Sequence, residues 1–233
     1  MKTLLVNGDS FLCNRHGGVD VNHTVAELLH AEHFVGHDMI KLAQGGSGND
    51  RTFLSTINWF ERHPERKLNA HVLICWTESQ RIDYPARSSD RNDFIHHTPP
   101  MDQTWSTFAL SAYMSHPWDT VISNIIRKFR LPEPHYPDWT VVKWYQNVLG
   151  LQNYLKANGI DYTFYNSLPP SLQEDCADHA YWRQAVDQNH FYKINYSQYE
   201  YCQDNQMFIS DNNHHPNEQA HINWAKQLIE FIQ

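Results

Sequence analysis

Short apolar runs alternate with amphipathic helix patterns along most of this chain, and this alternation restricts its fold more than any other feature. The runs in "KTLLVNG" (2–8) and "HVLICW" (71–76) are almost uniformly apolar, as in strands that are covered on both faces. Residues 19–33 and 50–64 place apolar side chains at helical spacing. Because strands that alternate with helices pair in parallel, the sequence predicts a three-layer α/β/α sandwich with a mainly parallel sheet.

The other elements continue this scheme. A second strand is expected at 37–43, before the glycine-rich turn "GGSGND". A long amphipathic helix is expected at 139–160, and a strand follows at 161–168. The chain closes with a short strand in "FIS", a polar turn, and a helix with Pro216 in its first turn.

Two long stretches interrupt the alternation. Residues 78–138 are rich in proline, aspartate and aromatic residues, with one helix expected at 120–130, and residues 169–206 are rich in tyrosine, asparagine and glutamine. We expect two irregular insertions, and the first, which is too long for a plain connection, is expected to be a lid or to shape a substrate site. A chain of 233 residues is long enough for one sizeable core, and we predict a single domain over 1–233.

Charge and cysteine content restrict the class of function. With 18 basic and 26 acidic residues, the formal net charge of −8 has the wrong sign for gripping a phosphate backbone, so no nucleic-acid partner is expected. The four cysteines are scattered and lack the spacing of a disulfide framework or a zinc knuckle. The sequence shows neither a signal-peptide core nor an apolar run of membrane-spanning length, so we expect a cytoplasmic protein without a membrane partner.

Polar residues that suit a hydrolytic site stand where predicted strands end or just before the last helix. They are Ser10 in "NGDSF", Gly48 in "GGSGND", and Asp211, His214 and His215 in "DNNHHP". The loops that follow parallel strands lie along one edge of a sheet, so residues far apart in sequence can converge there.

The residue types fit acyl transfer. A serine hydroxyl becomes an effective nucleophile when a histidine, oriented by a carboxylate, takes its proton. Ser10 offers the hydroxyl, and the turn before the last helix offers both partners. Gly48 precedes a predicted helix and can present its backbone amide to the oxyanion of a tetrahedral intermediate. Such a site needs no metal and no organic cofactor.

These blocks resemble those of the SGNH, or GDSL-like, hydrolases. "NGDSF" is similar to the first block of that family, "GGSGND" to its second and "DNNHHPNEQAHINWA" to its last, in the same order and over nearly the full chain. The resemblance implies that Ser10 is the nucleophile of an ester hydrolase and that its own amide and the amide of Gly48 bind the oxyanion.

Two positions depart from the family pattern. The third block carries an asparagine where this chain has Thr77, whose hydroxyl offers a hydrogen-bond donor instead. In the last block the family shows Asp, two residues, His and Pro. Here Asp211 stands three residues before His214, whereas the histidine that precedes Pro216 is His215.

Three assignments fit the last block. Asp211 orients His215 in a turn that is one residue longer, or His214 is the base, or Asn212 replaces the carboxylate. We favour Asp211 with His215, because Pro216 holds the preceding residue in an extended conformation and starts the helix.

The function that the sequence favours is that of a serine esterase cleaving a small O-acyl ester, and the aromatic insertions indicate a glycan as one candidate for the alcohol. The main alternative is a binding or structural protein on the same fold whose catalytic set has eroded, an interpretation supported by both departures. A third is a metal site at the paired histidines beside Asp211, with metal-dependent hydrolysis.

Two charged residues near the predicted site have structural interpretations. Arg81 is expected to pair with Glu78 or Asp83, although it could contact an acidic substrate. Asp9 is expected to be a turn or network residue rather than a catalytic acid.

Overall fold

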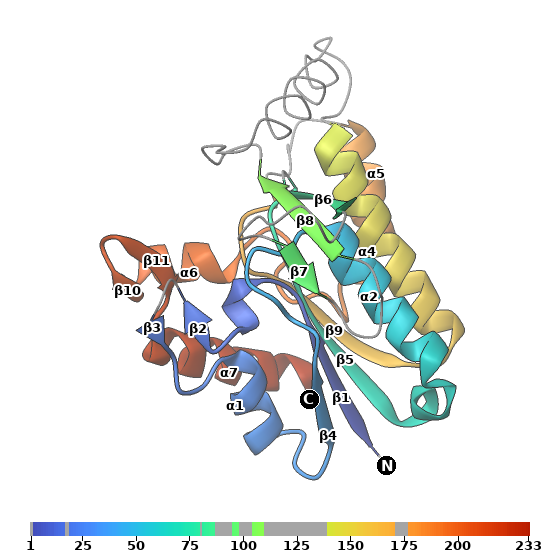
Figure 1. Cartoon of the computed structure of the whole chain (residues 1–233), viewed down its shortest axis with the longest axis horizontal. Coiled ribbons are helices and arrows are strands. Elements are labelled where there is room, and N and C mark those ends of the chain that lie inside the picture. The colour runs from blue at the N-terminus through green and yellow to red at the C-terminus, as the bar shows by residue number, and fades with distance from the viewer. Residues whose placement is uncertain are drawn as a thin grey trace.

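The computed structural model describes residues 2–16, 19–79, 81–86, 95–97, 104–109, 139–170 and 177–233. The helix expected at 120–130 lies outside these ranges. Where the chain is described, helices and strands follow one another largely in the order that the apolar runs predict, as Figure 1 shows.

Four parallel strands form the central sheet, in the order β4-β1-β5-β9. They are β1 (Thr3–Asn7), β4 (Asp38–Lys41), β5 (Ala70–Trp76) and β9 (Asp161–Asn166). β1 and β5 lie in the middle of the sheet and are buried almost throughout, which explains their apolar sequences. The four strands expected here are confirmed, and the strand that leads to Ser10 is a central one.

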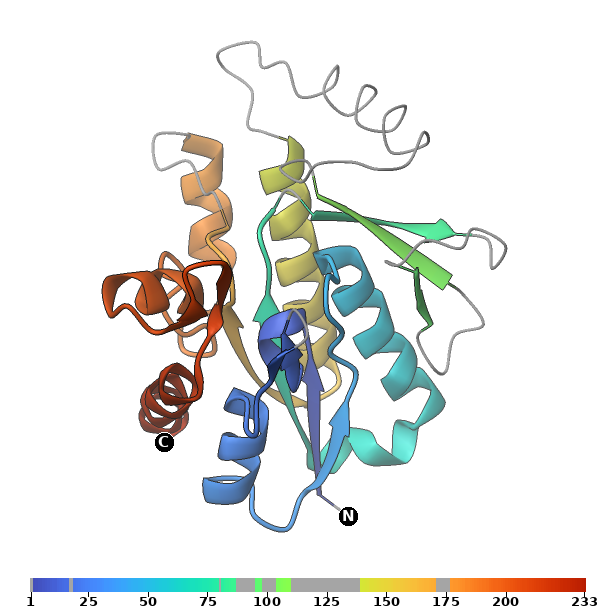
Figure 2. The same ribbon diagram turned by 60° about the vertical axis from the view of Figure 1, so that its left-hand side comes forward.

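Helices cover both faces of this sheet (Figures 1 and 2). The two pairs are α1 (Val25–Glu32) with α7 (Glu218–Ile232), and α2 (Asn49–Arg62) with α4 (Trp139–Ala157). Successive side chains of β1 point to opposite faces, so Leu4 packs in the core beneath α1 and α7, and Leu5 in the core beneath α2 and α4. The predicted three-layer sandwich is therefore confirmed.

The described part of the first insertion is a small antiparallel sheet in the order β6-β8-β7. Its strands are β6 (Arg81–Ala86), β7 (Ile95–His97) and β8 (Thr104–Ala109). This segment is more regular than its proline and aspartate content indicated. Pro85 lies in β6, at the edge of this sheet, where a missing N–H is tolerated. β6 also packs against α2, close to the glycine-rich turn.

The second insertion also contains regular structure. Its helices are α5 (Ala177–Ala185) and α6 (Gln198–Asp204). Between them the chain runs alongside β9, with isolated bridges at Phe191 and Ser197. This arrangement carries α6 to the edge of the sheet at which β9 ends.

The polar turn before the last helix is a hairpin of two short antiparallel strands, β10 (Phe208–Ser210) and β11 (Asn213–Pro216). Pro216 therefore lies in β11, and the expectation that it sits in the first turn of the helix was wrong. Asn217 is the N-cap of α7, and its side chain accepts the N–H of Ala220.

Short elements complete the described structure: η1 (Ser10–Leu12), β2 (Arg15–His16), β3 (Val19–Asp20) and η2 (Pro64–Asn69). No helix within the described ranges combines the length and the apolar character that crossing a membrane requires.

Candidate active site

Ser10 stands immediately after the central strand β1, at the start of η1. Gly8 has a φ of +149°, and a Cβ on it would lie 2.6 Å from the carbonyl oxygen of Cys75, so the turn presses against β5 in a way that only glycine allows. Asp9 caps η1, because its Oδ1 accepts the N–H of Phe11 at 3.0 Å. These contacts fix Ser10 at the carboxyl edge of the sheet.

The structure brings Ser10 and His215 together. Ser10 Oγ lies 3.0 Å from His215 Nε2, a hydrogen-bond distance between residues from opposite ends of the chain. The other ring nitrogen, His215 Nδ1, lies 2.7 Å from Asn213 Oδ1. The three side chains therefore form a row in which an amide oxygen occupies the place expected for a carboxylate.

Asp211 and His214 take no part in this row of contacts. Within the described part of the chain, the Asp211 carboxylate bonds to neither histidine, whereas its main-chain oxygen lies 3.0 Å from His214 Nε2. Our preferred pairing of Asp211 with His215 therefore differs from the structure. Side chains alternate along a strand, so Asn213 and His215 share one face of β11 and His214 points to the other. Asn213 was missed because the sequence pattern did not reveal this hairpin.

The environment of His215 keeps its imidazole neutral. Burial lowers the pKa of His215 below the ordinary value of 6.5, the positive charge of Arg81 lowers this pKa further, and the negative charge of Asp9 opposes both effects. A neutral imidazole whose Nε2 faces a hydroxyl is able to accept the hydroxyl proton. The electrostatics thus agree with a general base.

The expected oxyanion donors differ in availability. Within the described residues, the amide of Ser10 donates to no acceptor. The amide of Gly48, in contrast, donates to Asp83 Oδ1 at 2.9 Å, and Asp83 Oδ2 accepts the N–H of Arg51 at 2.8 Å. Asp83 comes from β6 and caps the N-terminus of α2, so the role expected for Gly48 conflicts with this conformation. The glycine beside the serine is Gly45, where an added Cβ would lie 3.9 Å from Ser10 Cβ.

Thr77 directly follows β5 and is buried. Its main-chain N–H donates to Asn49 Oδ1 at 3.0 Å, and Asn49 Nδ2 donates to the carbonyls of Thr77 and Glu78. Its hydroxyl has no hydrogen-bond partner among the described residues. Asn49 thus anchors this loop to α2, and the Thr77 hydroxyl is buried.

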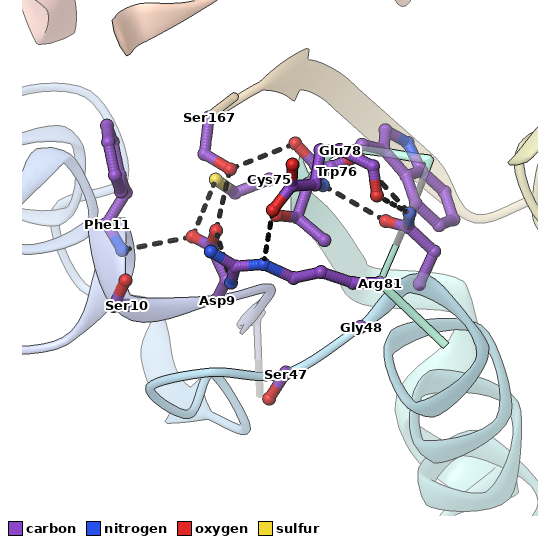
Figure 3. Close-up of polar contacts among 12 residues, drawn as sticks. Asp9, Ser10, Phe11, Ser47, Gly48, Cys75, Trp76, Glu78, Arg81 and Ser167 are labelled. Carbon is purple, nitrogen blue, oxygen red and sulfur yellow. Dashed lines mark hydrogen bonds and ion pairs between the residues drawn. The ribbon is translucent and has the colours of Figure 1, made fainter. Parts of the chain in front are cut away.

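A buried ion pair lies next to Ser10, as Figure 3 shows. The Asp9 side chain is 1% exposed; Asp9 Oδ2 accepts a 2.9 Å hydrogen bond from Ser167 Oγ and lies 3.5 Å from Arg81 Nη1. Arg81 Nε donates to Glu78 Oε1 at 3.1 Å. The expected pairing of Arg81 with Glu78 is confirmed, Asp9 is its second partner, and Asp9 is a network residue as anticipated.

A surface pocket of about 460 Å³ opens beside the Ser10–His215 pair. Its walls combine apolar, aromatic, amide and cationic side chains: Ser10, Phe11, Arg81, Leu168, Tyr199, Asn212, Asn213, His214 and His215. Arg81 comes from β6 and Tyr199 from α6, so each insertion contributes a side chain to this pocket. Asn212 lines it without replacing the carboxylate.

The paired histidines have separate partners. His215 faces Ser10, whereas His214 lies near the main chain of Asp211 and its ring packs 5.2 Å from that of Phe208. Across the part of the chain that the structure describes, no group of three or more His, Cys, Asp or Glu residues is arranged to hold a metal ion.

No protein-family model and no curated protein sequence matches the chain. Solved structures match it over its whole length. TesA has 14% identity and a TM-score of 0.56, covering 100% of this chain and 98% of its own. The esterase EstA from Pseudoalteromonas sp. has 13% identity and a TM-score of 0.53, covering 100% and 97%.

A lipase/acylhydrolase from Enterococcus faecalis has 9% identity and a TM-score of 0.51, covering 100% of this chain and 95% of its own. At such identities the likeness concerns the fold. The mainly parallel sheet with helices on both faces is the fold of these SGNH/GDSL-type structures.

Proposed function

We propose that the protein is a serine ester hydrolase that works through an acyl-enzyme on Ser10. The observation that carries this proposal is the 3.0 Å contact between Ser10 Oγ and His215 Nε2 at the carboxyl end of the central strand. A nucleophile and its base within hydrogen-bond reach, beside a pocket, is the geometry that acyl transfer requires.

The reaction follows from this geometry. His215 Nε2 takes the Ser10 proton as Oγ bonds to the acyl carbon, and the carbonyl π electrons move onto the oxygen. When this oxyanion collapses, the ester C–O bond breaks and His215 returns the proton to the leaving alcohol. A water molecule, deprotonated by the same histidine, then attacks the acyl carbon, and His215 returns the proton to Ser10 Oγ as the bond to the acyl carbon breaks and the carboxylic acid leaves. The Ser10 amide and the Thr77 hydroxyl are the proposed oxyanion donors from the described loops.

Asn213 gives this base an unusual partner. Its Oδ1 accepts the N–H of His215 Nδ1, which leaves the lone pair of Nε2 directed at Ser10. An amide orients the ring but carries no charge to compensate the imidazolium that forms during the reaction. The negative charge of Asp9, which raises the pKa of His215, supplies part of that compensation. We therefore expect a weaker base than one paired with a carboxylate.

The oxyanion role of Gly48 now depends on Asp83. Its amide becomes available to a substrate only when the Asp83 carboxylate moves away. The proposal accordingly rests on the amide of Ser10. Asp211 and His214 are assigned no step of the reaction.

The pocket favours a small acyl ester. Its volume of about 460 Å³ suits a compact substrate, and Phe11 and Leu168 give it apolar surface. Tyr199 adds an aromatic ring of the kind on which sugars stack, so a glycan ester stays a prediction for the alcohol side.

The test is hydrolysis of p-nitrophenyl esters with acyl chains of increasing length, together with an O-acetylated oligosaccharide. We expect the parent to favour the short chains and Ser10→Ala to be inactive. Ser210→Ala, an exposed serine outside the pocket lining, is the matched control and should keep full activity.

One observation favours a second candidate, a binding protein on the same fold. The Gly48 amide is occupied by Asp83, and Asn213 replaces a triad carboxylate, as an eroded site would show. This candidate predicts that the folded parent hydrolyses no ester at a rate above that of Ser10→Ala. Measurable turnover that disappears only in Ser10→Ala excludes it.

A further inference from the structure

The site lacks one oxyanion donor. Of the groups expected from the sequence, the Gly48 amide is bound to Asp83 and the Thr77 hydroxyl is a single neutral donor. Losing one preorganised donor typically costs about 10²–10³ in rate. A site with this deficit needs another donor near Ser10 to stabilise the developing negative charge.

Arg81 is the cation that lines the pocket together with Ser10 and His215. Its Nη1 is buried and lies 3.5 Å from Asp9 Oδ2, yet it makes no hydrogen bond to any described residue. Arg81 Nε, in contrast, donates a hydrogen bond to Glu78 Oε1. A planar guanidinium carries five N–H donors, so Arg81 has N–H groups beside Ser10 that donate to no described residue.

The position of Arg81 is built into the fold. Asp83, two residues further along β6, is 6% exposed and binds the first turn of α2 through both carboxylate oxygens. Residues two apart in a strand share a face, so docking Asp83 on α2 also turns Arg81 toward the site. Figure 3 shows the Arg81 side chain extended to Asp9, the neighbour of Ser10.

The charge of Arg81 reaches the reacting groups. It is one of the causes that lower the pKa of His215, so its field acts at the Ser10–His215 pair. Asp9 and Glu78 hold the guanidinium in place, and the loose 3.5 Å contact with Asp9 leaves room for a stronger, charge-assisted bond to form in the transition state.

We propose that Arg81 is a catalytic residue that donates to the oxyanion in place of the Gly48 amide, which Asp83 occupies. This inference rests on the proposed function. As Ser10 Oγ bonds to the acyl carbon and its proton passes to His215, the carbonyl oxygen gains the electron pair of the broken π bond. Arg81 donates an N–H to that oxygen without losing its own proton, and the bond lapses when the leaving alcohol departs.

The test compares Arg81→Gln and Arg81→Lys with the parent on two probes: a neutral p-nitrophenyl acyl ester, and a trifluoromethyl ketone that forms a tetrahedral oxyanion adduct with an active-site serine. In Arg81→Gln we expect kcat for the ester to fall by about 10²–10³, with a smaller change in KM. Affinity for the ketone should fall by a similar factor, and Arg81→Lys should lie between the two.

Arg66→Gln is the matched control. Arg66 also pairs with an aspartate, Asp38, at 3.1 Å, and its side chain is 24% exposed against 18% for Arg81, but it lies in η2 far from the pocket. This variant should keep the parent's kinetics. Thermal unfolding checks that each variant is folded, and Arg81→Lys, which keeps the charge beside Asp9, provides the measurement if the glutamine variant does not fold.

Other outcomes overturn the inference. An unchanged kcat and ketone affinity in both Arg81 variants would show that the ion pair is structural. A loss confined to KM for an ester that carries a carboxylate would make Arg81 an anion-recognition residue. In both cases the parent still turns over and forms the ketone adduct on Ser10. A folded parent that does neither overturns the proposed function itself, and this inference with it.

Discussion

The turn at Ser10 and the glycine-rich turn before α2 follow neighbouring parallel strands at the same edge of the sheet. Their backbone amides nevertheless differ in hydrogen bonding. The amide of Ser10 has no acceptor among the described residues, whereas the amide of Gly48 is capped by Asp83 from the first insertion. Buried Arg51 further fixes the second turn by donating to Ser47 and Gln44. The order of the strands thus brings both turns to the same edge of the sheet. Asp83, from the first insertion, binds the amide of one turn and leaves the amide of the other without an acceptor among the described residues.

The largest effect is expected at the two histidines of β11. Only one of them, His215, faces Ser10. His215→Ala removes the proposed base and should reduce kcat/KM by about 10⁴–10⁶. His214→Ala removes a ring from the pocket wall and should change kcat/KM by less than about tenfold, mainly through KM. Steady-state kinetics on one ester measures both. Equal losses in the two variants would contradict the assignment of His215.

The second effect concerns the capped turn. Asp83→Asn removes a negative charge near buried Arg51 and weakens the two hydrogen bonds that cap α2, and leaving buried donors poorly paired costs about 1–3 kcal/mol of stability. Chemical denaturation should show a loss of this order. Asp38→Asn is the control, because the Asp38 side chain, which pairs with Arg66, is 36% exposed, and its loss should cost about 1 kcal/mol or less. A similar loss in both variants would mean that Asp83 has no special role in the glycine-rich turn.

The third effect tests the neutral partner of the base. Asn213→Asp places a carboxylate 2.7 Å from His215 Nδ1, which stabilises the imidazolium and raises the pKa of His215. The parent's lowered pKa keeps the base neutral to below pH 6.5, so the acid limb of its pH–rate profile should lie below that value. In the variant this limb should move to higher pH and kcat on the plateau should rise about tenfold or more, because the reverse change in serine proteases costs far more. A profile identical to the parent's would show that Asn213 is not the partner of the base.

The smallest effect is a pH dependence of stability that comes from His71, at the start of β5. At the end opposite the active site, burial lowers the pKa of His71 to about 3, and the charges of His33, His190 and His37 contribute. Since the folded pKa lies below the ordinary 6.5, the unfolded chain takes up the proton first. The stability that neutral His71 preserves is therefore present above about pH 6.5 and is lost as the pH falls toward 3. His71→Gln should flatten the stability profile in this window and leave kcat unchanged. Loss of kcat would place His71 in contact with the active site.

Local patterns in the sequence predicted much of this molecule. The apolar runs identified the central strands, because a strand covered on both faces has to be apolar, and the Gly-Asp-Ser turn identified the serine. Pro216 led us to favour His215 over His214, and His215 is the histidine that faces Ser10, although Pro216 lies in β11 and not in the helix.

The features that the sequence did not predict depend on pairing between distant segments. Asn213 faces His215 only because β10 and β11 pair as a hairpin. Asp83 reaches Gly48 across 35 positions of the chain, through the strand that the first insertion contributes. No local pattern around either residue encodes these contacts, since the register of the strands determines them.

The most direct test of the central claim, that His215 activates Ser10, is intact-mass analysis after incubation with a fluorophosphonate probe. Such a probe modifies an activated serine without requiring the natural substrate. The structure predicts one adduct in the parent, on Ser10, which is absent in Ser10→Ala and forms far more slowly in His215→Ala. A folded parent that gains no adduct, or an adduct that persists in Ser10→Ala, would contradict the account.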